Sequence, residues 1–232
     1  MQFPEARSYS WVSTVQDDGR FYVVDGKTER DGYTAVNMPM VSAIQRKLSR
    51  GYTDTHNAIF KGDSECVIET PQGWKTPAEL AALPGKNSEF PPPLSSRSAA
   101  ALGLANRAPR YSNIQLNLSH PHEEIGLIVG SHVEIQAEKD GVSGTLSEEG
   151  AKLLLVHPGQ NQITALRASG TFQLWIKNGI LVKYEVRLAG TIAIGAGSSR
   201  RQIALRQNAV TELGNIDTTE LEIPEEAKRK LG

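Results

Sequence analysis

The feature that most constrains the fold is a run of alternating apolar residues that continues across a turn motif. The apolar positions are all even-numbered: Phe172, Leu174 and Ile176 precede Lys177-Asn178-Gly179, and Ile180, Val182, Tyr184, Val186, Leu188, Ile192 and Ile194 follow it. Successive side chains of a strand point to opposite faces of a sheet. The pattern therefore predicts two antiparallel strands that each carry one apolar face.

The length of the turn decides whether the two apolar faces coincide. A two-residue loop at Asn178-Gly179 pairs even positions with odd ones and would set Phe172 against Glu185. We therefore expect a three-residue loop with Gly179 in the left-handed region of a G1 bulge. The expected cross-strand pairs are Ile176 with Ile180, Leu174 with Val182, and Phe172 with Tyr184.

The second of these strands is too long for a flat sheet. Its parity persists past Gly190 to Ile194, beyond the roughly 3–10 residues of ordinary strands. Such a strand must twist and curl, and Gly190 is the natural bending point. Long curling antiparallel strands indicate a barrel or half-barrel.

The rest of the chain combines further strands with short helices. Residues 9–15 and 21–24 are aromatic and β-branched and end at glycine turns, which predicts a meander of hairpins. Residues 218–223 are predicted as a last strand. Helices are predicted over residues 37–51, from Pro77 after a Thr76–Glu79 capping box, over the alanine-rich residues 95–107, over 121–129, from Glu148 after Ser147, and over 224–231 at the surface.

These elements predict a mainly β (α+β) fold built on a strongly curved antiparallel sheet or half-barrel, with helices covering the concave face. We expect a single domain over residues 1–232. It comprises strands at about 8–74, a helical insert at about 76–130, strands with one helix at about 132–223, and a C-terminal helix at 224–231.

Composition excludes several classes of partner. The 25 basic and 26 acidic residues nearly balance, and no element carries a continuous basic stripe, so nucleic acid is not expected. We interpret Arg200-Arg201 and Arg206 as a charged strand edge. No apolar stretch is long enough for a membrane span. The single cysteine, Cys66, lies in an apolar run and is expected to be a buried small hydrophobe.

No motif for catalysis is found, so we expect a protein that is not an enzyme and uses no cofactor. The chain lacks a G-x-S-x-G elbow, a Walker loop, H-E-x-x-H and C-x-x-C. The nearest metal candidate is His120-Pro121-His122-Glu123-Glu124. A proline and two glutamates are also what the first turn of a helix favours, and we predict a helix start without a metal.

The order of the elements resembles the lipoprotein-carrier superfamily, the LolA-like and LppX-like proteins of cell envelopes. The local resemblance lies in the strand–turn–strand motif of residues 170–184, in residues 73–80 and in residues 140–151. The resemblance implies an incomplete, curved barrel closed by helices, with an acyl chain or lipid held between them. It also implies a bacterial envelope protein, periplasmic or exported if a signal peptide has been removed; residues 1–5 do not resemble one.

The apolar even-numbered face needs a cover, and an alanine-rich helix would fill its concavity poorly. We expect an apolar ligand site bounded by Phe172, Leu174, Val182, Tyr184, Ile125 and Ile128. Two functions stay open at this point. One is a carrier of a lipid or of an acylated protein. The other is a structural or protein-interaction module with a filled core and no ligand.

Overall fold

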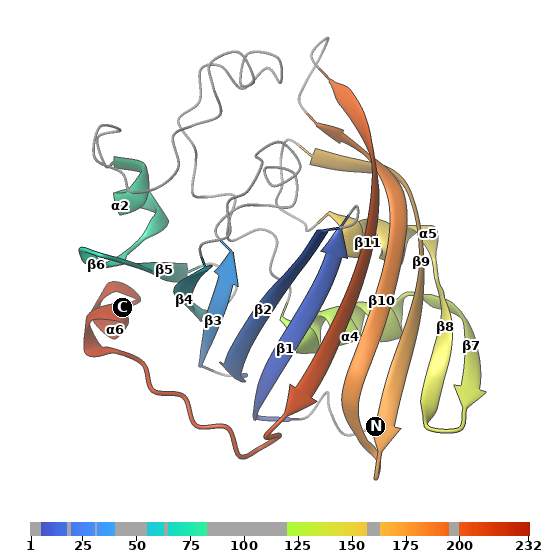
Figure 1. Cartoon of the computed structure of the whole chain (residues 1–232), viewed down its shortest axis with the longest axis horizontal. Helices are drawn as coiled ribbons and strands as arrows, with labels where there is room; N and C mark the ends of the chain where they lie inside the picture. The colour runs from blue at the N-terminus through green and yellow to red at the C-terminus, as the bar shows by residue number, and fades with distance from the viewer. Residues whose placement is uncertain are drawn as a thin grey trace.

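A computed structural model describes residues 6–17, 20–30, 32–39, 55–62, 65–82, 120–156, 163–194 and 200–232. Figure 1 shows a large, curved sheet with α4 and α5 lying across one face. The eleven strands are antiparallel to their neighbours and form one open sheet in the order β6-β5-β4-β3-β2-β1-β11-β10-β9-β8-β7. The predicted curved antiparallel sheet with helices on its concave face is confirmed.

The strands are β1 (Ser8–Asp17), β2 (Arg20–Glu29), β3 (Tyr33–Pro39), β4 (Thr55–Lys61), β5 (Glu65–Thr70), β6 (Gly73–Lys75), β7 (His132–Glu138), β8 (Gly141–Leu146), β9 (Ile163–Lys177), β10 (Ile180–Ile194) and β11 (Arg201–Gly214). The helices are α2 (Pro77–Ala82), α4 (Pro121–Gly130), α5 (Glu148–Leu155) and α6 (Glu225–Lys230). The first strand and the last strand pair with each other in the middle of the sheet, and this pairing joins two meanders.

The helices begin where their capping residues predict. In α2 the Glu79 backbone N–H donates to Thr76 Oγ1 at 3.2 Å, and the Thr76 N–H donates to Glu79 Oε2 at 2.7 Å. In α5 the Gly150 N–H donates to Ser147 Oγ at 3.1 Å. These side chains satisfy backbone donors that have no partner within the helix, which fixes the first turn.

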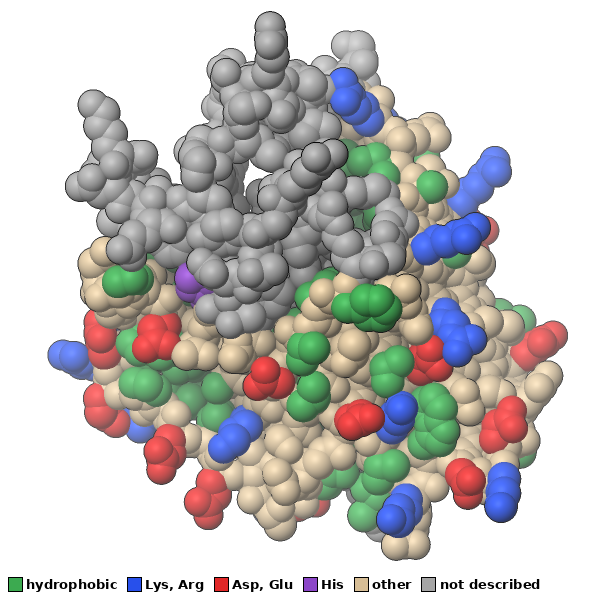
Figure 2. Space-filling model, viewed as in Figure 1, with side chains coloured by type: hydrophobic (Ala, Val, Ile, Leu, Met, Phe, Trp, Pro, Cys, Tyr) green, Lys and Arg blue, Asp and Glu red, His purple; other side chains and the backbone are tan. Residues whose placement is uncertain are grey.

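The two faces of the sheet differ in character. The concave side holds one large apolar cluster that includes Trp11, Phe60 and Cys66, and Cys66 is buried as predicted. Helix α5 packs on β8, β9 and β10, and α4 packs on α5. The opposite face mixes apolar, acidic and basic side chains (Figure 2), and Phe21 there is 69% exposed. The larger apolar cluster therefore lies on the side of α4 and α5.

The β9–β10 hairpin corrects the predicted loop and register. The loop has only two residues, Asn178 and Gly179, with φ of 53° and 79°. The predicted positive φ of Gly179 is confirmed. The one-residue shift that brings the apolar faces together lies within the strand, as a β-bulge that leaves Val182 without a partner. The pairs are consequently Leu181 with Ile176, Tyr184 with Leu174, and Val186 with Phe172.

The predicted strand over residues 218–223 is wrong. Strand β11 ends at Gly214, and Asn215 and Asp217 then take φ of 46° and 59°, which turn the chain out of the sheet. The chain continues to α6, where Ala227 and Leu231 are buried. They pack with Ile59, Val67 and Trp74 in a second apolar cluster, so the terminal helix is more than a surface feature.

The helix predicted over residues 37–51 is wrong at its start, because Asn37 pairs with Asn57 in the β3–β4 ladder. The remainder of that helix and the predicted helix over residues 95–107 lie outside the described residues. The predicted helices that begin near Pro121 and Glu148 are confirmed as α4 and α5.

The turn at Gly179 yields a first testable prediction. A Cβ at this position would meet nothing within 4 Å, so the cost of Gly179→Val arises from the positive φ of 79° alone. We expect a loss of about 1–2 kcal/mol in the free energy of unfolding, measured by urea denaturation.

The matched control is Gly126→Ala in α4, where a Cβ also meets nothing within 4 Å and the backbone is helical. This change should stabilise the protein by up to about 1 kcal/mol through helix propensity. Wild-type stability in Gly179→Val would contradict the assigned turn geometry.

Candidate functional site

Five of the six predicted site residues lie in one buried cluster on the concave face. Ile125 and Ile128 come from α4 and are 1% and 0% exposed. Phe172 and Leu174 come from β9, and Tyr184 comes from β10 and is 1% exposed. The structure thus brings together residues that lie some sixty positions apart in sequence. Their contact with a ligand stays a prediction.

The sixth residue, Val182, does not belong to the buried cluster. It is the unpaired residue of the bulge in β10 and is only half-buried. Its neighbour Leu181 is fully buried and belongs to the cluster instead. Sequence reasoning missed Leu181 because strict alternation assigns odd positions of this strand to the outer face.

Helix α4 is tied to the sheet by two tyrosine hydroxyl groups. The Tyr184 hydroxyl donates to Glu124 Oε2 at 2.5 Å. The Tyr9 hydroxyl lies 2.7 Å from His122 Nδ1 in a second hydrogen bond, and the two rings meet edge to face. Because Tyr9 is on β1 and Tyr184 on β10, the first turn of α4 spans β11, which lies between them.

Burial shifts the titration of these groups. Burial raises the pKa of Glu124, and the hydrogen bond from Tyr184 opposes part of that rise. Burial also raises the pKa of Tyr184 well above its usual value, and the charge of Glu124 adds to the effect. The pKa of Tyr9 rises to about 12 through burial, against hydrogen bonds that lower it. Both phenols therefore keep their protons at neutral pH.

A band of hydroxyl groups continues from these tyrosines across the concave side. Thr211 Oγ1 donates to Ser13 Oγ at 3.0 Å. Trp11 Nε1 donates to Thr28 Oγ1 at 3.2 Å, and Thr28 and Thr34 are both buried. Sequence reasoning did not single out these residues, although Thr28 and Thr211 occupy inward positions of their strands. The interior thus offers apolar surface together with a few fixed polar groups, as small-molecule sites do.

Of the two histidines at the start of α4, His120 is the N-cap residue. The His120 N–H donates to Glu123 Oε2 at 2.9 Å, and the rings of His120 and His122 stack with centroids 5.7 Å apart. Within the described ranges no three His, Cys, Asp or Glu side chains are close enough to hold a metal ion. That this segment binds no metal stays a prediction.

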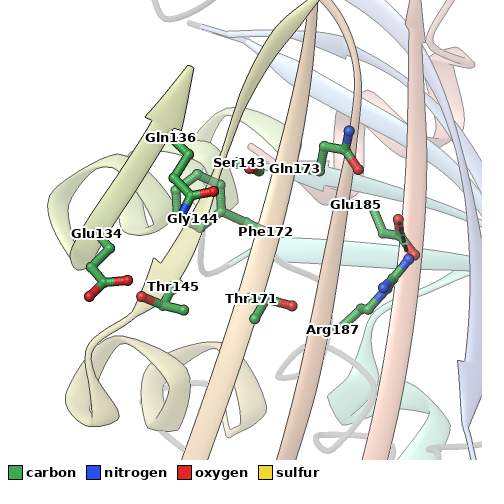
Figure 3. A pocket seen from close by; sticks show the side chains of 10 residues that line it. All are labelled: Glu134, Gln136, Ser143, Gly144, Thr145, Thr171, Phe172, Gln173, Glu185 and Arg187. Atoms are coloured by element: carbon green, nitrogen blue, oxygen red, sulfur yellow. Dashed lines mark hydrogen bonds and ion pairs between the residues drawn. The ribbon is translucent and has the colours of Figure 1, made fainter. Parts of the chain in front are cut away.

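A separate pocket of about 260 Å³ lies on the other side of the sheet, near β7 (Figure 3). Its lining residues are mostly polar and come from four neighbouring strands. They are Glu134, Gln136, Ser143, Gly144, Thr145, Thr171, Phe172, Gln173, Glu185 and Arg187. Arg187 donates from Nε and Nη2 to the two oxygens of Glu185, at 2.9 and 3.1 Å. This pocket is not the apolar site that the sequence predicts.

The fold and the concave cluster together define a half-barrel protein: an open, curved antiparallel sheet with helices on its concave face. No helix in the described part of the chain is long and apolar enough to cross a membrane.

Comparisons with known proteins place the chain only loosely. No family model matches it, and no curated protein matches it. Among solved structures it is similar to the Mycobacterium tuberculosis lipoprotein LppX, with a TM-score of 0.44 and 10% identity, over 93% of this chain and 89% of that chain. A likeness at this level is too loose to bear on function.

The buried carboxyl group of Glu124 yields a second prediction. The raised pKa means that the folded protein keeps this proton at pH values where the unfolded chain has lost it. The stability of the wild type should therefore fall as pH rises above about 4.5, until the folded-state pKa is passed. Glu124→Gln still accepts from Tyr184 but does not titrate, so its stability relative to the wild type should increase over that window.

Urea denaturation between pH 4 and pH 8 measures the effect. A second variant, Tyr184→Phe, removes the hydrogen bond that lowers the pKa of Glu124. In that variant the pH-dependent loss should extend to higher pH. A difference between Glu124→Gln and the wild type that does not change with pH would refute the assignment.

Proposed function

We propose that this chain is a non-enzymatic binding or carrier protein for a hydrophobic ligand, such as a lipid or the acyl chain of a modified protein. The observation that supports it is the concave face of the open sheet, where buried apolar side chains from many strands form one cluster. In this proposal the ligand lies between the sheet and α4, against Phe172, Leu174 and Tyr184.

The dimensions of the elements support this proposal. Eleven strands about 4.8 Å apart make a sheet roughly 48 Å wide between its outer strands, before curvature is considered. The ten residues of α4 and the eight of α5 give helices only about 15 and 12 Å long. Among the described elements, both helices are thus short against the width of the sheet, and in this proposal the ligand extends along the concave face beyond them.

Helix α4 has the attachments expected of a cover that can be lifted. Its polar bonds to the sheet are concentrated in its first turn, at His122 and Glu124. Its other end, at Val129, is 50% exposed. A ligand that displaces Ile125 and Ile128 would gain about 0.8 kcal/mol for each methylene it buries, which offsets their loss of contact. The hydroxyl band would bind the polar end of such a ligand.

A second candidate is a structural or protein-interaction module with a filled core. It is favoured by the near-zero exposure of Ile125, Ile128 and Tyr184, because side chains that border a water-sized void keep some accessible surface. The two candidates differ in whether an acyl chain can enter. The bacterial envelope location stays a prediction.

A fluorescent fatty acid separates the two candidates and yields the third prediction. We expect saturable binding to the wild type, measured by fluorescence titration. Val186→Trp should weaken that binding roughly tenfold, about 1.4 kcal/mol, because Val186 lies in the concave cluster opposite Phe172 and the indole would occupy the place of the ligand. Mass spectrometry of lipids extracted from the purified protein would identify a natural ligand.

The matched control is Val12→Trp, which adds the same bulk at a position 45% exposed on the other face of β1. Val12 alternates with buried Trp11, so the new ring would point away from the concave side. This variant should bind the fatty acid as the wild type does. Equal weakening in both variants, or no binding by the wild type, would leave the interaction module as the better candidate.

A further inference from the structure

The two outer edges of the sheet are protected very differently. Strand β6 has only three residues and is contacted by α2 and α6. Strand β7 has seven residues, and every one of them is exposed. Among the described elements its main contact is with β8. The β7 edge therefore presents a row of backbone donors and acceptors that no other described strand pairs.

Strand β7 also lacks two of the residue types that most often prevent edge pairing. It contains no lysine and no proline. Two of its apolar side chains are strongly exposed, Val133 at 65% and Ile135 at 51%. Ile135 pairs with Gly144 on β8, which has no side chain to cover it. A long edge with exposed β-branched residues is a template for another strand.

We infer that this edge pairs with the β7 edge of a second copy of the chain, antiparallel and about a two-fold axis through Ile135. An isologous contact of this kind closes after two copies. The two sheets would then continue into each other through one additional ladder.

The charges along β7 select this register over its neighbours. Centring on Ile135 sets His132 opposite Glu138 of the second copy and Glu134 opposite Gln136. Apolar residues then also meet each other: Ile135 faces its own equivalent, and Val133 faces Ala137. No two carboxylates are opposed, and an imidazole meets a carboxylate at each end.

The two neighbouring registers that keep the faces aligned oppose like charges. Centring on Glu134 sets that carboxylate against its own equivalent. Centring on Gln136 sets Glu134 against Glu138. Directly opposed like charges destabilise a strand pair. The single register shift of the β7–β8 ladder lies between His132 and Glu134, so Ile135 is in the regular part of the strand.

A cysteine cross-link tests both the pairing and its register. The native Cys66 is buried, so Ile135→Cys introduces the one exposed thiol of the described residues. Opposed residues of an antiparallel pair have Cβ atoms about 4.5–5.5 Å apart, which is close to disulfide geometry. We expect Ile135→Cys to form a covalent dimer under mild oxidation, seen on a non-reducing gel.

The matched control is Glu134→Cys, one residue away on the same exposed strand. In the inferred register position 134 faces position 136, so this variant alone should cross-link at least tenfold more slowly. Mixed with Gln136→Cys it should form the heterodimer. Equal rates for Ile135→Cys and Glu134→Cys would indicate random collision and would overturn the inference.

Sedimentation equilibrium tests the association without cysteines. The wild type should show a concentration-dependent dimer, and Ile135→Lys, which opposes two ammonium groups at the axis, should be monomeric with an unchanged melting temperature. Val12→Lys, exposed on β1, should dimerise like the wild type. A wild type that stays monomeric at every concentration, or that only pairs with an extended segment of another protein, would refute self-pairing.

Discussion

The pairing of the first strand with the last is the constraint on which the rest of the structure depends. β1 and β11 form a regular ladder from Ser10 with Gly214 to Asp17 with Gln207. Without it the chain would hold two separate meanders, each with an additional unpaired edge. The turn after β11 strengthens the junction, because the Arg7 N–H donates to Asp217 Oδ1 and the Asp217 N–H donates to Ser8 O, both at 2.7 Å.

The same junction places the anchors of α4. Tyr9 and Tyr184 lie on the strands to either side of β11, and they meet the helix only when β1 and β10 are held one strand apart. Closing a contact over some two hundred residues costs chain entropy before it contributes any stability. The helix and the β1–β11 ladder therefore stabilise each other, since each fixes the geometry that the other requires.

Sequence patterns predicted the elements with local causes and missed those set by distant packing. The alternation of apolar residues over 172–194 and the capping residue Ser147 are local sequence signals. Both long strands and α5 could be predicted from them. The extra residue that aligns the two apolar faces was predicted in the loop but lies at Val182 in β10. The alternation of apolar residues requires one extra residue and does not show where it lies. The path of residues 218–223 depends on Trp74 and Val67, which α6 covers, and no local pattern reports that contact. The joint burial of five of the six predicted residues could be predicted because the apolar faces of β9, β10 and α4 must be buried together.

The asymmetry of the two sheet edges follows from how the chain uses its ends. At the β6 edge, the C-terminal segment brings α6 against Trp74, and Lys230 bonds to Glu79 of α2. Helices α2 and α6 therefore prevent another strand from pairing with β6, and their polar sides face water. At the β7 edge the neighbouring α4 and α5 pack inward, onto each other and the concave side, and so leave the strand's outer edge to solvent. Helices α4 and α5 cover the candidate site and therefore cannot also protect β7. The covered concave face and the open β7 edge thus result from the same packing of these two helices.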